Sequence, residues 1–268
     1  MNDNLIYTIN DGVACVTINR PKQFNAITPD MFDELADWFD EIGQRPDVHL
    51  IHMRAAGRHF AAGGDIKPML NGINVPVEER VEYEVGLLRP LYTLLPKMFH
   101  VPQPIFMSVR GYCLGATAGM VALSDFALVS KTAKFSFPQT RFGSATLDGI
   151  SYPLPRAVGH KKAMELCVFN TLFDALEAKE MGMVTWVVED EALEEKEAKI
   201  VEKLARCAPL VLRHNKKLLR NSMFSTYEDQ LNAEIESWSE CVLTDDFYEG
   251  LTAFEEKREP KFGVWRSR

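Results

Sequence analysis

The segment Gly111-Tyr112-Cys113-Leu114-Gly115-Ala116-Thr117-Ala118-Gly119 directly follows the apolar run Ile105–Val109. Glycine and alanine are concentrated where a predicted strand ends and a predicted helix begins. Small residues at such a junction let a ligand approach the backbone closely, and the free N–H groups of the first helical turn point toward it. The segment therefore predicts a strand-turn-helix unit that offers main-chain donors to an anion.

A second glycine-rich segment lies earlier in the chain. Phe60-Ala61-Ala62-Gly63-Gly64-Asp65-Ile66-Lys67 comes shortly after the predicted strand His49–Arg54 and is also expected to open a helix. One such turn is weak evidence for an anion-binding site, because glycine-rich turns are common between strands and helices. Two of them in one chain indicate a pair of donors for a developing oxyanion.

The order of the other predicted elements indicates an α/β protein. Strand-forming runs at Leu5–Ile9 and Val13–Ile18 flank an Asp-Gly turn, which is typical of a hairpin. Thr28 and Pro29 are typical of a helix cap and a first helical residue. Further strands are predicted at His49–Arg54, Ile105–Val109, Phe126–Ser130 and Val184–Val188. Helical segments between the strands predict a sheet covered by helices and joined by right-handed crossovers.

The pattern changes from about residue 191 onward, where strand signals become few. Helices are predicted at Glu191–Cys207, Pro209–Asn221 and Thr226–Leu243. We therefore expect a core domain over residues 1–190 and a C-terminal helical region over residues 191–268.

Composition and charge limit the class of protein. The chain is 46% hydrophobic and 25% charged, as in ordinary globular proteins, and its net charge of −8 disfavours binding to nucleic acid or to an anionic membrane. The five cysteines are scattered and never spaced as CxxC, which favours reduced thiols over disulfides or a zinc site. No leader pattern or membrane-spanning apolar run is visible. We expect a cytoplasmic protein with no metal, no nucleic acid partner and no membrane partner.

Several motifs in collinear order resemble the crotonase (enoyl-CoA hydratase/isomerase) superfamily. They are the two glycine-rich segments, Asn19-Arg20-Pro21, Asn25-Ala26, Asp125, Pro155–Gly159, Glu177–Val184 and Glu249–Arg258. The resemblance implies a crotonase spiral fold of repeated ββα turns with a C-terminal helical trimerisation region. It also implies assembly as a homotrimer or as a hexamer built from two trimers. The implied substrate is an acyl-CoA thioester, with coenzyme A as part of the substrate and no separate cofactor.

The resemblance also implies which residues form the site. By position, Gly64 and Ala116 would supply the two backbone N–H groups that hold the thioester oxygen. The implied contacts to CoA are Lys22, Ala26, Ala62, Asp65 and Ile66. Lys261 and Phe262 would close over the CoA of a neighbouring subunit.

The sequence departs from the family pattern where hydratases carry two glutamates. By alignment, those positions are occupied by Gly119 and Gln139. Glycine has no side chain and an amide has no useful basicity near neutral pH, so neither residue can act as a general base. Gln139 could still orient a water or the substrate. We therefore expect a reaction other than ordinary two-glutamate hydration.

Asp148 lies in Ser144-Ala145-Thr146-Leu147-Asp148-Gly149, a loop in which other branches of the superfamily carry a functional aspartate. Beside an apolar acyl pocket its pKa would be raised, and it could serve as a base or a nucleophile. The alternative is a structural aspartate that forms an Asx turn before Gly149. Glu82 and Glu84 follow a variable region and are expected to face solvent.

Other candidate residues carry weaker signals. Cys113 has no histidine to activate it and is interpreted as a packing residue. His59 and His100 are lone histidines without a metal-binding pattern. Candidates for the wall of the acyl pocket are Met69, Leu70, Tyr92, Met120 and Trp265.

Two functions from different classes remain open. The first is an acyl-CoA enzyme, a lyase, hydrolase or isomerase, that stabilises a thioester enolate or adduct. It would use Asp148 to hydrolyse a C–C or C–X bond, to isomerise a double bond or to carry out an atypical hydration. The second is a catalytically inactive acyl-CoA-binding subunit, which the same missing glutamates motivate. The intact glycine turns favour the enzyme.

Overall fold

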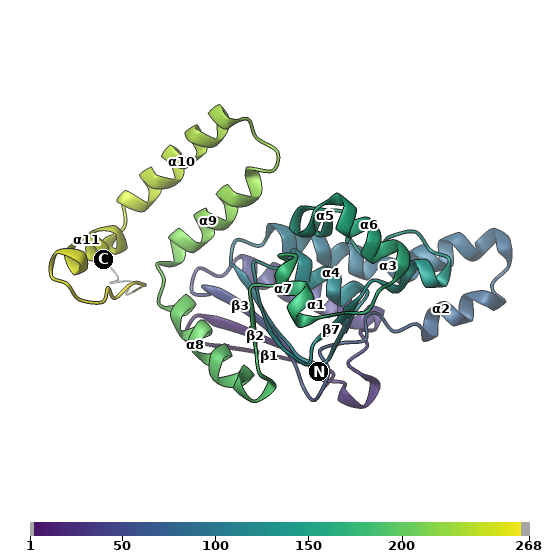
Figure 1. Cartoon of the computed structure of the whole chain (residues 1–268). Helices are drawn as coiled ribbons and strands as arrows, with labels where there is room; N and C mark the ends of the chain where they lie inside the picture. The colour runs from purple at the N-terminus through teal and green to yellow at the C-terminus, as the bar shows by residue number, and fades with distance from the viewer. Residues whose placement is uncertain (1–2, 264–268) are drawn as a thin grey trace.

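The computed structural model describes residues 3–263 and shows an α/β core with a helical arm extending from it (Figure 1). The larger sheet has six strands in the order β1-β2-β3-β4-β6-β9 and is parallel apart from the antiparallel β1–β2 pair. Its strands are β1 Leu5–Asn10, β2 Val13–Ile18, β3 Leu50–Ala55, β4 Ile105–Val109, β6 Phe126–Ser130 and β9 Trp186–Val188. Each strand predicted from the sequence is present, with its ends within two residues of the prediction.

The β1–β2 hairpin shows why the local sequence was informative. Asp11 and Gly12 both have positive φ angles, of 48° and 76°. Two positive φ angles in a two-residue loop match the right-handed twist of the flanking strands, and Asp-Gly adopts them readily. The hairpin prediction is confirmed.

A second, three-stranded sheet was not predicted. It contains β5 Tyr112–Leu114, β7 Lys134–Ser136 and β8 Phe173–Asp174, in that order. Isolated bridges pair Ala61 with Cys113 and Ile27 with Gly64. The two glycine-rich segments therefore run side by side in this second layer.

Helices cover the sheets and enclose a large apolar core and a second, smaller apolar cluster. α1 Pro29–Gly43 begins after Thr28 as predicted, although the Thr28 side chain makes no capping hydrogen bond. Its buried face packs against α3 Val77–His100, a long helix that contains Pro90 and Pro96. The shorter helices of the core are α2 Lys67–Asn71, α4 Ala116–Leu123, α5 Pro153–Val158, α6 His160–Phe169 and α7 Ala175–Glu180.

The C-terminal helices divide into one that packs on the core and three that extend from it (Figure 1). α8 Leu193–Ala205 covers the larger sheet, with Leu193 and Ile200 against Phe106. The other three are α9 Pro209–Asn221, α10 Tyr227–Val242 and α11 Asp245–Glu255.

Buried charges attach the extended helices to the core. Lys216 and Arg220 of α9 each pair with Asp125 at 2.9 Å, and Lys216 Nζ also donates to the Gln103 carbonyl oxygen at 2.7 Å. α9 therefore anchors the arm. No helix within residues 3–263 combines the length and the apolar run needed to cross a membrane.

Candidate active site

The two glycine-rich turns lie against each other. The Ala61 N–H donates to the Tyr112 carbonyl oxygen at 2.9 Å, and the Leu114 N–H donates to the Ala61 carbonyl oxygen at 3.1 Å. A Cβ added to Gly63 would lie 2.9 Å from the Leu114 oxygen and 3.9 Å from the Ala116 nitrogen. Only glycine fits this approach, which places the first turn beside the start of α4.

The amides of Gly64 and Ala116 are free to donate. The Ile27 N–H donates to the Gly63 oxygen and the Asp65 N–H donates to the Ile27 oxygen, so the residues on either side of Gly64 face Ile27. In such a pairing the intervening residue directs its own N–H away from the partner strand. Ala116 is the first residue of α4, so its N–H has no acceptor within the helix. Within residues 3–263, neither amide has a hydrogen-bond acceptor.

Gly115 fixes the direction of the second turn. Its φ of 55° and ψ of −123° form a backbone conformation that residues with a side chain rarely adopt. A Cβ at this position would lie 3.9 Å from both Asp148 Oδ2 and Gln139 Nε2. These two side chains therefore lie directly beside the turn that presents the Ala116 amide.

Asp148 is held in place from two elements. Gln139, buried in the short 3-10 helix Pro138–Phe142, donates from Nε2 to Asp148 Oδ2 at 2.8 Å. The Asp148 backbone is left-handed, with φ of 61°, and its N–H donates to the Tyr92 hydroxyl of α3 at 3.2 Å. Burial raises the pKa of Asp148 to about 6, and the hydrogen bond from Gln139 opposes part of that rise. The carboxyl group thus titrates close to neutral pH.

The loop of Asp148 fills the space above Gly119. A Cβ at Gly119 would lie 2.8 Å from Ile150 Cγ1 and 3.2 Å from the Asp148 carbonyl oxygen. A side chain at residue 119 would therefore displace the loop that carries the aspartate. The sequence predicted that residue 119 offers no base, but not that its missing side chain makes room for Asp148.

Known proteins share this architecture. A family model for enoyl-CoA hydratase/isomerase matches residues 8–264. The chain belongs to the enoyl-CoA hydratase/isomerase family. It is 31% identical over 251 residues to a probable enoyl-CoA hydratase from Mycobacterium leprae, covering 93% of this chain and 94% of the relative. It is 28% identical over 258 residues to the trans-2-decenoyl-[acyl-carrier-protein] isomerase of Streptococcus mutans, covering 96% and 97%.

Solved structures of the enoyl-CoA hydratase/isomerase family confirm the fold. The crystal structure of enoyl-CoA hydratase from Bacillus anthracis superimposes with a TM-score of 0.87 at 27% sequence identity, covering 97% of this chain and 98% of that one. The predictions of crotonase-superfamily membership and of a crotonase α/β fold are therefore confirmed.

The residues implied as CoA contacts in the enoyl-CoA hydratase/isomerase family come from two adjacent segments. The Ala62 N–H donates to the Phe24 carbonyl oxygen at 2.9 Å, which joins residues 22–26 to residues 62–66. Lys22, Ala62 and Ile66 are exposed, and Ala26 is half-buried. The exposed members could reach a ligand that lies along this edge.

Asp65 has a visible role inside the protein. Its carboxylate pairs with Arg20 at 3.6 Å and accepts the Lys67 N–H at 3.1 Å, and both side chains of the ion pair are largely buried. Asp65 therefore holds the first glycine turn to the segment after β2. The sequence did not reveal Arg20 as its partner, since the pair depends on tertiary structure.

Asn25 is a positioning residue whose function the sequence analysis missed. It is fully buried, has a positive φ of 55°, and donates from Nδ2 to the Ala56 and His59 carbonyl oxygens at 2.8 and 2.7 Å. Its Oδ1 accepts the Arg20 N–H at 2.7 Å. Asn25 thus joins the segment after β2 to residues 56–59, which lead into the first glycine turn. An asparagine within a short turn is the signal that could have identified it.

Several weaker candidates have structural positions. Cys113 is buried beside Thr117, and burial raises its thiol pKa to about 12, as expected of a packing residue. Glu82 is exposed, but the expectation that Glu84 faces solvent is wrong. The Glu84 carboxylate lies over Gly72, and its Oε2 is buried without a hydrogen-bond partner among the described residues.

The candidates for the pocket wall differ in position. Met69 and Leu70 are exposed on α2, whereas Met120 is fully buried in α4 and belongs to the core. His59 stacks on Tyr112, and His100 lies edge-on to Phe99.

The predicted C-terminal contacts pack on the chain's own last helix. The Lys261 N–H donates to Glu249 at 2.8 Å, and the Phe262 ring lies against Gly250 of α11. Trp265 lies outside the described residues.

Proposed function

We propose that this protein shifts the double bond of an enoyl-CoA thioester, with Asp148 as the base that removes and returns one proton. One observation carries the proposal. A single carboxyl group with a pKa of about 6 lies beside the glycine turn that presents the Ala116 amide. An acid that titrates near neutral pH is suited to both halves of a proton transfer.

The proposed reaction places negative charge on the thioester oxygen. Asp148 takes a proton from a carbon of the acyl chain, and the electron pair of that C–H bond forms an enolate. The N–H groups of Gly64 and Ala116 donate to the enolate oxygen, and loss of one such donor typically costs about 3–4 kcal/mol of transition-state stabilisation. The protonated Asp148 then returns the proton to a different carbon, which leaves the double bond shifted and the atoms unchanged in number.

A single carboxyl group is sufficient for this reaction. Hydration by two glutamates divides the activation of water and the transfer of its proton between two groups, and residues 119 and 139 provide no carboxylate for that task. A proton shift uses one group twice and consumes no water. Gln139 donates to Oδ2 of Asp148, and among residues 3–263 no group donates to Oδ1, which would face the substrate.

The relatives are consistent with this choice. The Streptococcus mutans relative is named as an isomerase of trans-2-decenoyl-[acyl-carrier-protein], a thioester with the double bond the proposal requires. The Mycobacterium leprae relative is named as a probable enoyl-CoA hydratase. We carry over from both an unsaturated acyl thioester as the substrate class.

The proposal extends to the CoA moiety and to assembly. Lys22, Ala26, Ala62 and Ile66 would contact the CoA, with Lys22 near its phosphates. The chain would assemble as a homotrimer or a hexamer through α9–α11, whose exposed apolar side chains support a contact with another copy. Examples are Leu219, Ile235, Trp238 and Phe254.

The test incubates the purified full chain with 3-enoyl-CoA and 2-enoyl-CoA esters and follows the products by mass spectrometry. We expect interconversion of the two esters without a gain in mass. Asp148→Asn should reduce turnover by about 10³-fold or more while thioester binding persists, because it removes the only proposed base. Glu82→Gln, which removes an exposed carboxylate of α3, is the matched control and should be fully active.

Four results would contradict the proposal. A product that has gained one water would indicate hydration, and cleavage of the acyl group would indicate a hydrolase. Normal turnover by Asp148→Asn would remove Asp148 from the mechanism. Binding of every ester without any product would favour the inactive subunit.

A further inference from the structure

A polar cavity of about 610 Å³ lies at the start of the short strands β5 and β7, which begin at Tyr112 and Lys134. It is lined by residues 57–59, 110–112, 132, 134 and 190. Most of these follow the last residues of β3, β4, β6 and β9, and Tyr112 and Lys134 begin β5 and β7. Ligands of parallel α/β sheets commonly bind outside the carboxyl ends of the strands. None of the lining residues is among the proposed contacts of the thioester.

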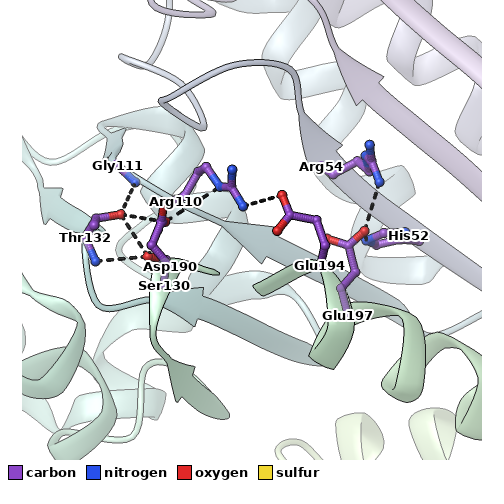
Figure 2. Close-up of polar contacts among 9 residues, drawn as sticks. All are labelled: His52, Arg54, Arg110, Gly111, Ser130, Thr132, Asp190, Glu194 and Glu197. Carbon is purple, nitrogen blue, oxygen red and sulfur yellow. Dashed lines mark hydrogen bonds and ion pairs between the residues drawn. The ribbon is translucent and has the colours of Figure 1, made fainter. Parts of the chain in front are cut away.

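One wall of the cavity is fixed by its own hydrogen bonds (Figure 2). Asp190 Oδ1 accepts from Ser130 Oγ at 2.6 Å and from Thr132 Oγ1 at 3.1 Å, and it lies 3.8 Å from Arg110 Nε. Arg110 also donates to Glu194 of α8 at 2.5 Å. The hydrogen bond from Ser130 is the main reason that the pKa of Asp190 is lowered. In this wall, Arg110 is therefore paired with Asp190 and Glu194.

Two further cations line the cavity, and they are less closely paired than Arg110. Arg58 is exposed and forms no hydrogen bond or close ion pair within residues 3–263, although its charge acts on Asp190 from a longer distance. Lys134 has one acidic neighbour, Asp174, at 3.8 Å. Tyr112 and Lys134 are register partners in the parallel strands β5 and β7, so their side chains lie next to each other on one face.

His59 adds a neutral donor. The Tyr112 N–H donates to His59 Nδ1 at 3.1 Å, so Nδ1 carries no proton and Nε2 is the N–H of the neutral ring. Partial burial and the nearby Arg58 lower the pKa of His59, which keeps the ring neutral. The ring stacks on Tyr112 with 4.8 Å between centroids, and this contact fixes its orientation.

We propose that this cavity binds a small phosphomonoester, with Arg58 and Lys134 as the ligands of the phosphate group. Three cations, Arg58, Arg110 and Lys134, line the cavity, against one carboxylate, Asp190. Asp190 already accepts hydrogen bonds from Ser130 and Thr132. Such an arrangement is unusual in a chain with a net charge of −8. A phosphate accepts several hydrogen bonds, and the planar fork of an arginine matches its oxygens. The volume is in the range of organic ligand pockets, so the phosphate carries an organic group.

Calorimetric titration of the full chain with ribose 5-phosphate, adenosine 5′-monophosphate and inorganic phosphate tests the proposal. We expect saturable binding of at least one phosphomonoester, tighter than that of inorganic phosphate. Arg58→Ala and Lys134→Ala should each weaken it about tenfold or more, the usual effect of losing one hydrogen bond to a charged group. Lys131→Ala is the matched control, because Lys131 pairs with Glu189 and does not line the cavity. It should bind as the wild type does.

Two further measurements separate this site from the proposed thioester site. Asp148→Asn should bind the phosphomonoester unchanged, and saturating acyl-CoA should not displace it. Thermal unfolding of every variant checks that a loss of binding does not reflect a loss of folding. Arg58→Gln, which removes the charge but keeps most of the side chain, is measured in the same way.

The proposal is overturned if neither phosphomonoester binds, if inorganic phosphate binds as tightly as both, or if Arg58→Ala and Lys134→Ala bind like Lys131→Ala. Displacement by acyl-CoA would also overturn it, since the cavity would then be part of the thioester site.

Discussion

The candidate active site and the helical arm differ in how well a single chain buries their apolar side chains. Around the glycine turns, Cys113, Ala118 and Phe137 are fully buried by other parts of the same chain. Along the arm, Leu219, Trp238 and Phe254 remain 61–86% exposed. Large apolar patches on a protein surface usually mark an interface. One chain therefore provides every residue of the proposed chemistry, whereas the apolar side chains of the arm would be buried only in the proposed assembly with other copies.

Charged residues in the arm provide the largest expected effect. The double variant Ile235→Asp, Trp238→Asp places two carboxylates on the exposed apolar face of α10. Burying unpaired charges in an apolar contact is strongly unfavourable, so we expect the assembly to dissociate completely into monomers. Sedimentation velocity gives the oligomeric state directly. Glu236→Gln, a polar change at the exposed position between them, should leave the assembly intact. A wild-type protein that is already monomeric would show that the arm is complete without a partner.

Gly115→Ala tests whether the core site depends on backbone geometry. The added Cβ disfavours the φ of 55° and ψ of −123° that aim the Ala116 amide. Loss of one oxyanion donor lowers kcat by about 10²–10³-fold, and we expect an effect of that order. Gly159→Ala is the matched control, because Gly159 has a φ of 80° and a ψ of 154°, a similarly restricted conformation away from the turn. It should lose stability but keep its kcat. Equal losses of kcat in both variants would contradict the role of Ala116.

The pH dependence of kcat/KM gives the smallest effect. Asp148 must be ionised to accept a proton, and its pKa is raised to about 6. We expect kcat/KM to fall about tenfold per pH unit below this pKa and to be constant above it. Gln139→Leu removes the hydrogen bond that favours the ionised form, so the midpoint should move to higher pH. A profile that is flat from acidic to neutral pH would exclude Asp148 as the base.

The same ionisation affects stability. The folded-state pKa of Asp148 lies above its unfolded value, so between about pH 4 and 6 the folded state binds more protons than the unfolded state. Stability contributed by the protonated form is thus lost as the pH rises through this window, by an amount on the order of 3 kcal/mol. Asp148→Asn should lack this decline when denaturant unfolding is measured at several pH values.

The sequence predicted the elements that have strong local signals. The Asp-Gly hairpin, the apolar strands and both glycine turns are all found where they were expected. The second sheet was missed because β5 and β7 have three residues each, too few for an alternating pattern to be recognised.

The site could be predicted only in part. Asp148 and Gln139 were identified from their positions in motifs, and the structure brings them within 2.8 Å of each other. The contact of Asp148 with Tyr92 joins residues 56 positions apart, and the partial burial of Glu84 depends on how the turn Gly72–Asn74 packs against α3. No local pattern encodes such contacts, because they depend on how distant segments meet in the folded chain.

The close fit of Ile150 over Gly119 restricts how this site can change in evolution or by design. Introducing a glutamate at residue 119 would force out the loop that carries Asp148, so the old and the new acid cannot occupy the site together. A route from this protein to a two-glutamate hydratase must therefore rebuild the loop before, or together with, the substitution. A variant with the glutamate at residue 119 and an otherwise unchanged loop would have neither Asp148 in its present place nor a pair of glutamates.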